Sequence, residues 1–497
     1  AGVWDDGRKQ QVQAAFASAG DPAFTAETFR RVEAALDRYA TTWATAQAAS
    51  CRAVQGGAQG DELAHLRGAC LARRFAELRA VVDVLARADR QTVERAVNVV
   101  AGLGDVGSCT DEQVLTSSFV PPSSAGARAE ASALRSRLDA ARAEARSGQY
   151  APALSRVRGA VVEARALGYP PVLAEALGAL SELESLSGRA RAAEDAAVEA
   201  IRVAAAGRHS RAAAEAWVQL IESVGVHQAQ PERALGLRLG AEAALAWDGA
   251  DTVLQASFLT ALARIRRNQG DYGDATALAT HALDLLGDAS NDDPARQLER
   301  ATILTTLGDA AYSRGEYEEA DRRFRAALEL RRAALGPDHP EVASSLNDLG
   351  NNDYARGRYA EARETLERAL TLRERVLGPE HPDLSNTETG LGAVFSALGD
   401  YRASRDHYAR AAAIRRAALG PDHPRTASAL MNLGSAEFAL GELDRAQEHY
   451  EAARAIQERV LGPDHPELAY SLTNLGLVLR NKELLTDSVR YYKRALQ

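Results

Sequence analysis

The chain has 497 residues, 46% of them hydrophobic and 26% charged, so it has ample apolar material for a folded core. Its formal net charge of −9 argues against a nucleic-acid backbone as the main ligand. No apolar run approaches the length of about 18 residues that a membrane-spanning helix needs, and no segment has the pattern of a secretory signal peptide. We therefore expect a folded chain with no membrane segment and no nucleic-acid partner.

The first 118 residues are predicted to form a helical leading domain. Apolar residues recur at helical spacing over 9–17, 25–50, 62–88 and 92–101. Gly56, Gly57 and Gly60 mark the turn between the two long helices. The Pro-Pro-Ser-Ser run at 121–124 falls in a linker that we place at 119–129.

The leading domain holds the three cysteines of the chain, Cys51, Cys70 and Cys109. Cys51 ends one long predicted helix and Cys70 lies a few turns into the next, so an antiparallel hairpin would bring these two together. The odd number leaves one thiol unpaired, or paired with a cysteine outside this chain. Three buried, reduced thiols of a cytoplasmic protein are the alternative.

The rest of the chain is repetitive. The hexapeptide Leu-Gly-Pro-Asp-His-Pro at 335–340 returns at 377–382 (with Glu for Asp), at 419–424 and at 461–466, each time 42 residues later. A fixed period of this size indicates a stack of helical supersecondary units. Such a stack buries its apolar faces between neighbours and leaves one long concave surface free.

Each unit is predicted to be a pair of helices. In the unit at 341–376 a first helix covers 341–355, Gly357 breaks it, and a second helix runs over 360–376 until Gly378 and Pro379 end it. Asp338 and Glu341, like Asp464 and Glu467, have the spacing of a capping box for the next helix. Nine such pairs are expected, with turns near Gly148, Gly188, Gly225, Gly270, Gly315, Gly357, Gly399, Gly441 and Glu483. Their period is loose over 130–300 and regular over 301–497.

The repeat resembles the tetratricopeptide repeat, whose signature positions hold Leu349-Gly350, Gly357, Tyr359, Ala362, Leu366 and Ala369. The 42-residue period and the Leu-Gly-Pro-Asp-His-Pro linker are similar to the kinesin-light-chain subtype. The resemblance implies an all-α fold, in which a right-handed superhelical solenoid of about nine helical pairs follows the leading domain.

A second resemblance covers nearly the whole chain. Gly2-Val3-Trp4-Asp5, Phe16, Trp43, Cys51, Arg67, Cys70-Leu71, Arg74, Leu78, Asp89, Val93, Ala96 and Cys109-Thr110-Asp111 resemble a stretch of myxobacterial-type transmembrane Ser/Thr protein kinases. In that family a cytoplasmic kinase domain and a membrane helix precede the stretch, and the repeats lie outside the cytoplasm. The family pattern has a further Cys just before the Gly-Val-Trp-Asp segment, which implies a partner for the third thiol.

No set of catalytic or metal-ligating residues emerges. The chain has no Gly-rich loop before a Val-Ala-Ile-Lys-like strand, no His-Arg-Asp loop and no Asp-Phe-Gly, nor any His-Glu-x-x-His, Cys-x-x-Cys or Gly-x-Ser-x-Gly. His339, His381, His423 and His465 stand one unit apart, too far to share an ion, and we interpret them as helix-starting hydrogen-bonding groups. We expect no intrinsic enzyme activity, metal or cofactor.

The concave groove is the predicted site. In tetratricopeptide repeats the first helix of each pair lines it, and the residues around the Leu-Gly pair point into it. The candidates are Thr306, Asp309, Tyr312, Asn347, Asp348, Asn351, Tyr354, Asn432, Ser435, Phe438 and Asn474. The resemblance implies that Asn432 and Asn474 clamp a peptide backbone, since an amide both donates and accepts. Gly390 interrupts that series, Asp348 would repel an acidic ligand, and hydrogen bonding between neighbouring helices is the alternative role of the asparagines.

We expect a module that binds a protein or peptide, with self-association as a further option. The kinase resemblance makes it the extracytoplasmic, periplasmic sensor region of a receptor-type Ser/Thr kinase. The alternatives are a cytoplasmic tetratricopeptide adaptor or scaffold, and the regulatory array of another multidomain enzyme.

Overall fold

The computed structural model describes residues 2–55, 61–112, 115, 122, 124–248, 251–288, 293–463, 465–466 and 468–496. Apart from a 3-10 turn and one π-helical segment, every regular element in these residues is an α-helix, and no strand occurs among them. The chain forms two compact units, Ala1–Pro337 and Asp338–Gln497. The predicted all-α fold is confirmed.

The first unit begins with the leading helices α1 (Asp6–Ala17), α2 (Pro22–Gln55), α3 (Asp61–Leu85) and α4 (Arg90–Ala101), and the 3-10 turn η1 (Gly107–Cys109). These helices match the predicted ranges closely, although the predicted turn at Gly56, Gly57 and Gly60 lies outside the described residues. Helical pairs follow: α6 (Ala125–Arg146) with α7 (Tyr150–Leu167), α8 (Pro170–Leu186) with α9 (Ala190–Ala206), α13 (Thr252–Asn268) with α14 (Tyr272–Leu286), and α15 (Pro294–Ser313) with α16 (Tyr317–Leu335).

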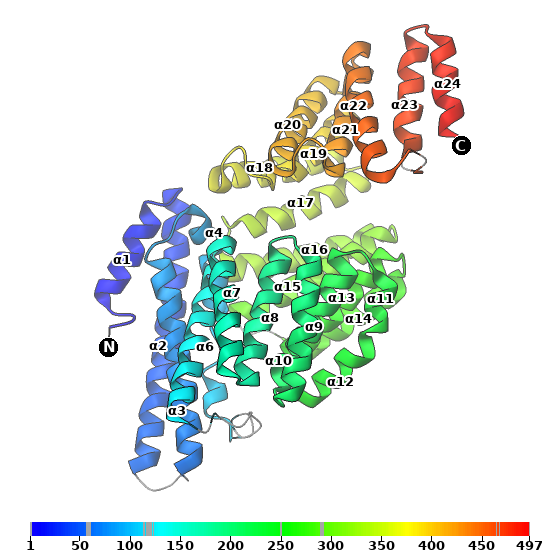
Figure 1. Cartoon of the computed structure of the whole chain (residues 1–497). Helices are drawn as coiled ribbons and strands as arrows, with labels where there is room; N and C mark the ends of the chain where they lie inside the picture. The colour runs from blue at the N-terminus through cyan, green and yellow to red at the C-terminus, as the bar shows by residue number, and fades with distance from the viewer. Residues whose placement is uncertain are drawn as a thin grey trace. The chain divides into compact units, whose positions relative to one another are not determined.

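The second unit holds four pairs that follow one another in Figure 1. They are α17 (Pro340–Ala355) with α18 (Tyr359–Leu377), α19 (Leu384–Ala397) with α20 (Tyr401–Leu419), α21 (Pro424–Ala439) with α22 (Leu443–Leu461), and α23 (Leu468–Asn481) with α24 (Leu485–Ala495). Gly357 turns between helices with φ +74°, and Glu483 adopts φ +63° at the equivalent turn. The left-handed turn therefore persists where glycine is missing, at the cost that a side chain carries in this region.

In each pair of the second unit, a glycine on the first helix receives a large side chain from the second helix. A Cβ added to Gly350 would lie 2.6 Å from Cγ of Leu366, and one added to Gly392 would lie 2.6 Å from the ring of Tyr408. Leu366 is fully buried and Tyr408 is 9% exposed. The glycines let the helices of a pair approach closely, which explains why they recur with the repeat.

Three expectations need correction. The turn predicted near Gly225 is absent, because Gly225 lies in the π-helical segment Ser223–His227 and packs against Ile265; the positive φ of 53° falls at Ala229 instead. This segment joins α10 (Ser210–Glu222) to the short helices α11 (Pro231–Gly236) and α12 (Arg238–Asp248). The predicted linker is helical from Ala125 onward, where Ser124 caps α6; residues 119–121 and 123 lie outside the described residues.

The third correction concerns the helix starts. The N-cap of α17 is His339, whose Nδ1 accepts from the backbone N–H of Glu341 at 3.1 Å, whereas Asp338 pairs with Arg375. Nδ1 of His423 accepts from the N–H of Arg425 in the same way. The predicted role of the linker histidines is confirmed at these positions, and the capping box at Asp338 is wrong. Residues 464 and 467 of the second predicted box lie outside the described residues.

Candidate functional site

In the second unit, one residue per turn of each first helix is left partly exposed. The positions lie just before the Leu-Gly pair, just after it and one turn later. We call this surface the first-helix face; it comprises Asp348, Asn351, Tyr354, Gly390, Ala393, Ser396, Asn432, Ser435, Phe438, Asn474, Leu477 and Arg480. The leucines between them, such as Leu349 and Leu475, are buried, so the face is a polar and aromatic stripe over an apolar layer.

Asparagine amides without internal partners mark this face. Asn432 is partly exposed, and no described residue hydrogen-bonds its amide. Nδ2 of Asn474 is buried without a partner. The sequence candidate Asn347 is not part of this face, because its residue is only 8% exposed and its Oδ1 is buried without a partner. Buried polar atoms are nearly always satisfied, so the unpartnered Nδ2 of Asn474 is unusual, and the partly exposed amide of Asn432 is open to a ligand or an ordered water. Asn432 and Asn474 therefore do not serve to bond neighbouring helices within the described chain.

Two other candidates are held by their surroundings. A Cβ added to Gly390 would lie 3.0 Å from Oδ1 of Asn351, so the amide of Asn351 occupies the gap that Gly390 leaves in the series. Oγ of Ser435 donates to the carbonyl of Met431 at 2.9 Å and accepts from the hydroxyl of Tyr450 at 3.0 Å. Asp348 is partly exposed on the same helix as Asn351.

Aromatic side chains border the amides. Tyr354 is 37% exposed and its ring centroid lies 5.6 Å from that of Tyr359, while Phe438 packs partly on the core beneath. Tyr470 at the start of α23 is 62% exposed and was not among the sequence candidates. Its position matches Ser344, Asn386 and Ser428 in the preceding units. An aromatic residue where the other repeats have small polar ones was the available signal.

The candidates of the first unit are engaged within that unit. Thr306 is 5% exposed, and its hydroxyl donates to the carbonyl of Thr302 at 3.1 Å. Asp309 pairs with Arg267; burial raises the pKa of Asp309, and the charge of Arg267 only partly offsets this. Tyr312 is 38% exposed and its ring meets that of Tyr317 edge-on at 5.5 Å.

Sequence reasoning missed that helix α3 of the leading domain packs on the first repeats. Arg73 of α3 lies 3.6 Å from Oδ1 of Asp139 on α6 and 3.7 Å from Oε2 of Glu175 on α8. Glu175 is 7% exposed and also accepts from Arg135 at 2.8 Å and contacts His209 at 3.3 Å. Burial raises the pKa of Glu175, but Arg135 and Arg73 outweigh it and hold the pKa well below its usual range.

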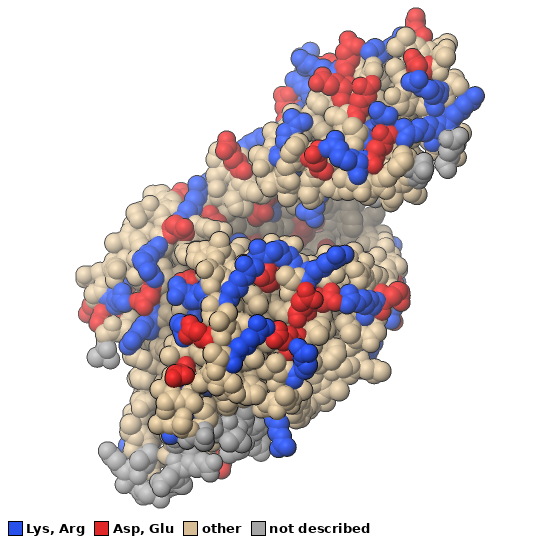
Figure 2. Space-filling model, viewed as in Figure 1, with Lys and Arg blue, Asp and Glu red and all other residues tan. Residues whose placement is uncertain are grey.

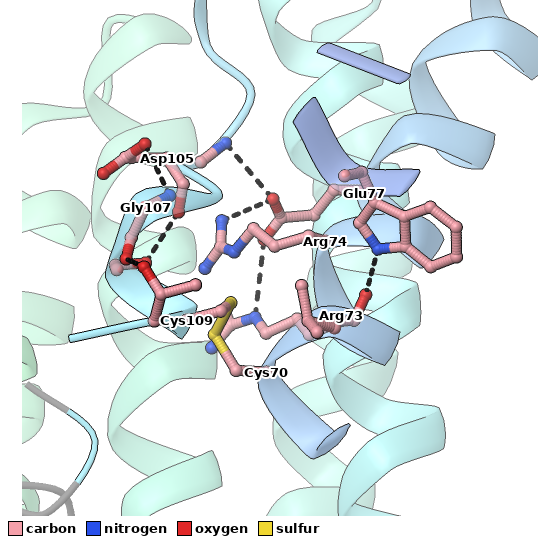
Figure 3. Close-up of a disulfide and its surroundings, with 12 residues drawn as sticks. Cys70, Arg73, Arg74, Glu77, Asp105, Gly107 and Cys109 are labelled. Atoms are coloured by element: carbon pink, nitrogen blue, oxygen red, sulfur yellow. Dashed lines mark hydrogen bonds and ion pairs between the residues drawn. A yellow bond between two sulfur atoms is a disulfide. The ribbon is translucent and has the colours of Figure 1, made fainter. Parts of the chain in front are cut away.

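A disulfide lies one turn from Arg73. Cys70 of α3 is bonded to Cys109 of η1, with their Cα atoms 5.5 Å apart. Figure 3 shows the pair beside Arg74, which donates to Glu77 at 2.5 Å, while Glu77 also accepts from the N–H of Gly104 at 3.2 Å. Cys51 is an exposed free thiol, so the hairpin pairing of Cys51 with Cys70 does not form. The disulfide fixes the η1 turn to the helix that reaches the repeats.

Two histidines on second helices of the second unit, His407 of α20 and His449 of α22, are bonded to buried glutamates. Nδ1 of His407 lies 2.6 Å from Oε2 of the fully buried Glu388, and Nδ1 of His449 lies 2.7 Å from Oε2 of Glu437. In the described part of the chain, no three His, Cys, Asp or Glu side chains gather as a metal site would require. None of its helices combines the length and hydropathy of a membrane span.

Comparison with known protein families identifies the family of the repeats. Residues 299–375, 347–417, 393–446 and 425–497 each match the tetratricopeptide repeat family. Residues 299–497 are a tetratricopeptide-repeat region. Comparison with curated protein sequences finds no match.

Solved structures with similar folds cover more of the chain. The apo form of RapI is 14% identical, covers 73% of this chain and 96% of its own, and has a TM-score of 0.51. BtubC (BKLC) from P. vanneervenii is 23% identical over 45% of this chain and 89% of its own, with a TM-score of 0.42. A Rap protein complexed with competence and sporulation factor is 14% identical, covers 74% of this chain and 97% of its own, and has a TM-score of 0.47. At these identities the likeness to RapI shows a shared fold alone.

Proposed function

We propose that the tetratricopeptide-repeat region binds an extended peptide segment of a partner protein along the first-helix face of residues 338–497. The observation that carries this proposal is the pair of amides at Asn432 and Asn474, one repeat apart, which no described residue hydrogen-bonds. An asparagine amide donates to a peptide C=O and accepts from a peptide N–H, so it reads the backbone of an extended chain whatever its sequence.

The surroundings of these amides suit such a ligand. Tyr354, Phe438 and Tyr470 offer partly exposed rings that bury apolar side chains and keep one polar edge in water. Tyr408 and Tyr450 behind the face are buried, and burial raises the pKa of each to about 12, so they add no charge near neutral pH. Backbone bonding by the amides and side-chain burial by the rings would together give affinity and specificity.

The test is peptide selection on the full chain. A library of random 12-residue peptides is screened, and affinities of the selected peptides are measured by titration calorimetry. The double variant Asn432→Ala/Asn474→Ala should bind them at least tenfold more weakly, because each lost hydrogen bond contributes about 1 kcal/mol. Gln447→Ala is the matched control, because Gln447 lies on a second helix and its amide donates to Glu451 at 2.8 Å. Equal affinity of wild type and double variant would contradict the proposal.

We further propose that this module is the extracytoplasmic sensor region of a receptor-type Ser/Thr kinase. The resemblance of the leading segment supports this, and so does the Cys70–Cys109 disulfide, because structural disulfides persist in oxidising compartments. Ligand binding or self-association of the repeats would then be relayed to a kinase domain. The test is mass analysis of the non-reduced protein, isolated from its native compartment and treated to alkylate free thiols. Within this chain only Cys51 should be alkylated, or none of the three cysteines if Cys51 pairs with a cysteine outside this chain. Three alkylated cysteines would favour the cytoplasmic scaffold.

A further inference from the structure

Two arginines of the second unit reach the same helical turn from opposite sides. Arg373 of α18 donates to the hydroxyl of Thr387 and, at 3.0 Å, to Oγ of Ser344. Arg415 of α20 donates to Oδ1 of Asn386 at 3.3 Å. Asn386 and Thr387 are consecutive residues in the first turn of α19, so two guanidinium groups meet at this turn.

Arg373 and Arg415 occupy equivalent positions of the repeat, 42 residues apart, and the next repeat has no arginine at this position. The next equivalent residue is Gln457, whose side-chain oxygen is buried without a partner. A third cation joins the cluster, because Nη1 of Arg415 lies 3.5 Å from the carbonyl of Arg425, the exposed second residue of α21. The positive charge is thus concentrated at the starts of α19 and α21.

This cluster lacks the carboxylates that other arginines of the unit have. Arg410 pairs with Glu374 at 2.5 Å, Arg459 with Asp422 at 2.5 Å and Arg494 with Glu458 at 2.7 Å. Figure 2 shows the same interspersion of acidic and basic side chains over the visible surface.

By contrast, Arg373, Arg415 and Arg425 form no ion pair with a described carboxylate. Arg373 is only 5% exposed, and its guanidinium is bonded to hydroxyl groups. Burial lowers the pKa of Arg373, and burial together with the charge of Arg425 lowers the pKa of Arg415. Asp383 and Asp348 attract the charge of Arg373 only from a greater distance. Each lowered pKa reflects a positive charge that its surroundings do not fully compensate.

We propose that Arg415 and Arg425, with Arg373 behind them, form an anion-binding subsite at the edge of the first-helix face, which accepts an acidic side chain of the bound peptide. Guanidinium groups bind carboxylate and phosphate oxygens in a fixed, often bidentate geometry, so both an Asp or Glu side chain and a phosphorylated Ser or Thr fit this chemistry. Arg415 and Arg425 are accessible to such a group, whereas Arg373 acts through the field of its buried charge. The subsite rests on the proposed peptide binding and assigns it a charge preference.

Two carboxylates limit where the acidic group of the ligand can lie. Asp383 at the N-cap of α19 and Asp348 on α17 both act on the charge of Arg373. The acidic residue of the ligand is therefore expected beside Arg415 and Arg425, of which Arg425 lies on α21, the helix that carries Asn432.

The test compares matched peptides on the full chain. Peptides selected by the wild type are resynthesised with Glu, Gln or phosphoserine at each position in turn, and the affinities are measured. The wild type should prefer Glu or phosphoserine over Gln by about tenfold at one position. Arg415→Gln/Arg425→Gln should abolish that preference while still binding the Gln peptides. Arg416→Gln, which removes an exposed charge from the same helix, should keep it.

The outcomes separate the two proposals. If no peptide binds, the proposed function fails and the subsite fails with it. If peptides bind through Asn432 and Asn474 with no charge preference, the subsite alone is refuted. The same holds if the Arg415→Gln/Arg425→Gln variant keeps the charge preference. A preference for phosphoserine over Glu identifies a phosphorylated ligand, and equal affinities identify an acidic one.

Discussion

The substitution Glu175→Gln tests whether the leading domain is joined to the repeats by buried charge. Glu175 is 7% exposed and faces Arg135 at 2.8 Å, His209 at 3.3 Å and Arg73 of α3 at 3.7 Å. Breaking a buried ion pair costs about 3–5 kcal/mol. Gln keeps the volume and part of the hydrogen bonding, so we expect a loss of about 2 kcal/mol.

Hydrogen exchange is the appropriate assay, because repeat arrays open locally and a single unfolding free energy is poorly defined for them. A loss of about 2 kcal/mol accelerates exchange about 30-fold where opening breaks this contact, in α3 and α8. Glu163→Gln is the matched control. Glu163 pairs with Arg137 at 2.5 Å on the surface, with both side chains substantially exposed, and such pairs contribute at most about 1 kcal/mol.

The effect should also depend on pH. The folded pKa of Glu175 is depressed, so its charge contributes stability that is fully present above the unfolded pKa of about 4.3 and is lost as pH falls through the folded value. The difference between wild type and Glu175→Gln should therefore be largest above about pH 5 and shrink in more acidic solution. Exchange in α3 that is no faster in Glu175→Gln than in Glu163→Gln, or a difference independent of pH, would refute the reasoning.

Three further variants test the helix packing and the disulfide. Gly350→Ala should destabilise the second unit by about 1–2 kcal/mol despite its gain in helix propensity, because the new Cβ meets Cγ of the fully buried Leu366 at 2.6 Å. Gly159→Ala, with nothing within 4 Å, should instead stabilise α7 by up to about 1 kcal/mol. Hydrogen exchange in α17 and α7 reports both signs, and faster exchange in both variants would contradict the contact argument. Removing the disulfide by Cys70→Ser/Cys109→Ser should cost about 4 kcal/mol, since it closes a loop of 39 residues; an unchanged melting midpoint with and without reductant would show that the bond is dispensable.

The regular repeats were predictable because their signals are local. The helices expected over 341–355 and 360–376 correspond to α17 (Pro340–Ala355) and α18 (Tyr359–Leu377), since the Gly-X-Tyr turn and the Gly-Pro stop act within a few residues. The turn predicted at Gly225 was wrong because the signal there is not local. That glycine is required by contact with Ile265, 40 residues away in the chain, and not by its backbone conformation.

Features that depend on long-range packing were not predictable. Nothing in the spacing of Arg73, Asp139 and Glu175 indicates that α3 packs on α6 and α8. The pairing of Cys70 with Cys109, in place of Cys51, depends on which side of α2 faces solvent. For the site, the repeat register placed Asn432 and Asn474 on the first helices, but only the structure shows that Asn351 fills the gap at Gly390 and that Thr306 and Ser435 are bonded internally.

The location of a bound peptide tests the central claim most directly. A peptide selected on the full chain and carrying a photoreactive group at each position in turn is cross-linked, and the attachment sites are mapped by mass spectrometry. We expect them on α21 and α23, around Asn432, Phe438, Tyr470 and Asn474. Cross-links confined to the second helices α18, α20, α22 and α24 would contradict the account.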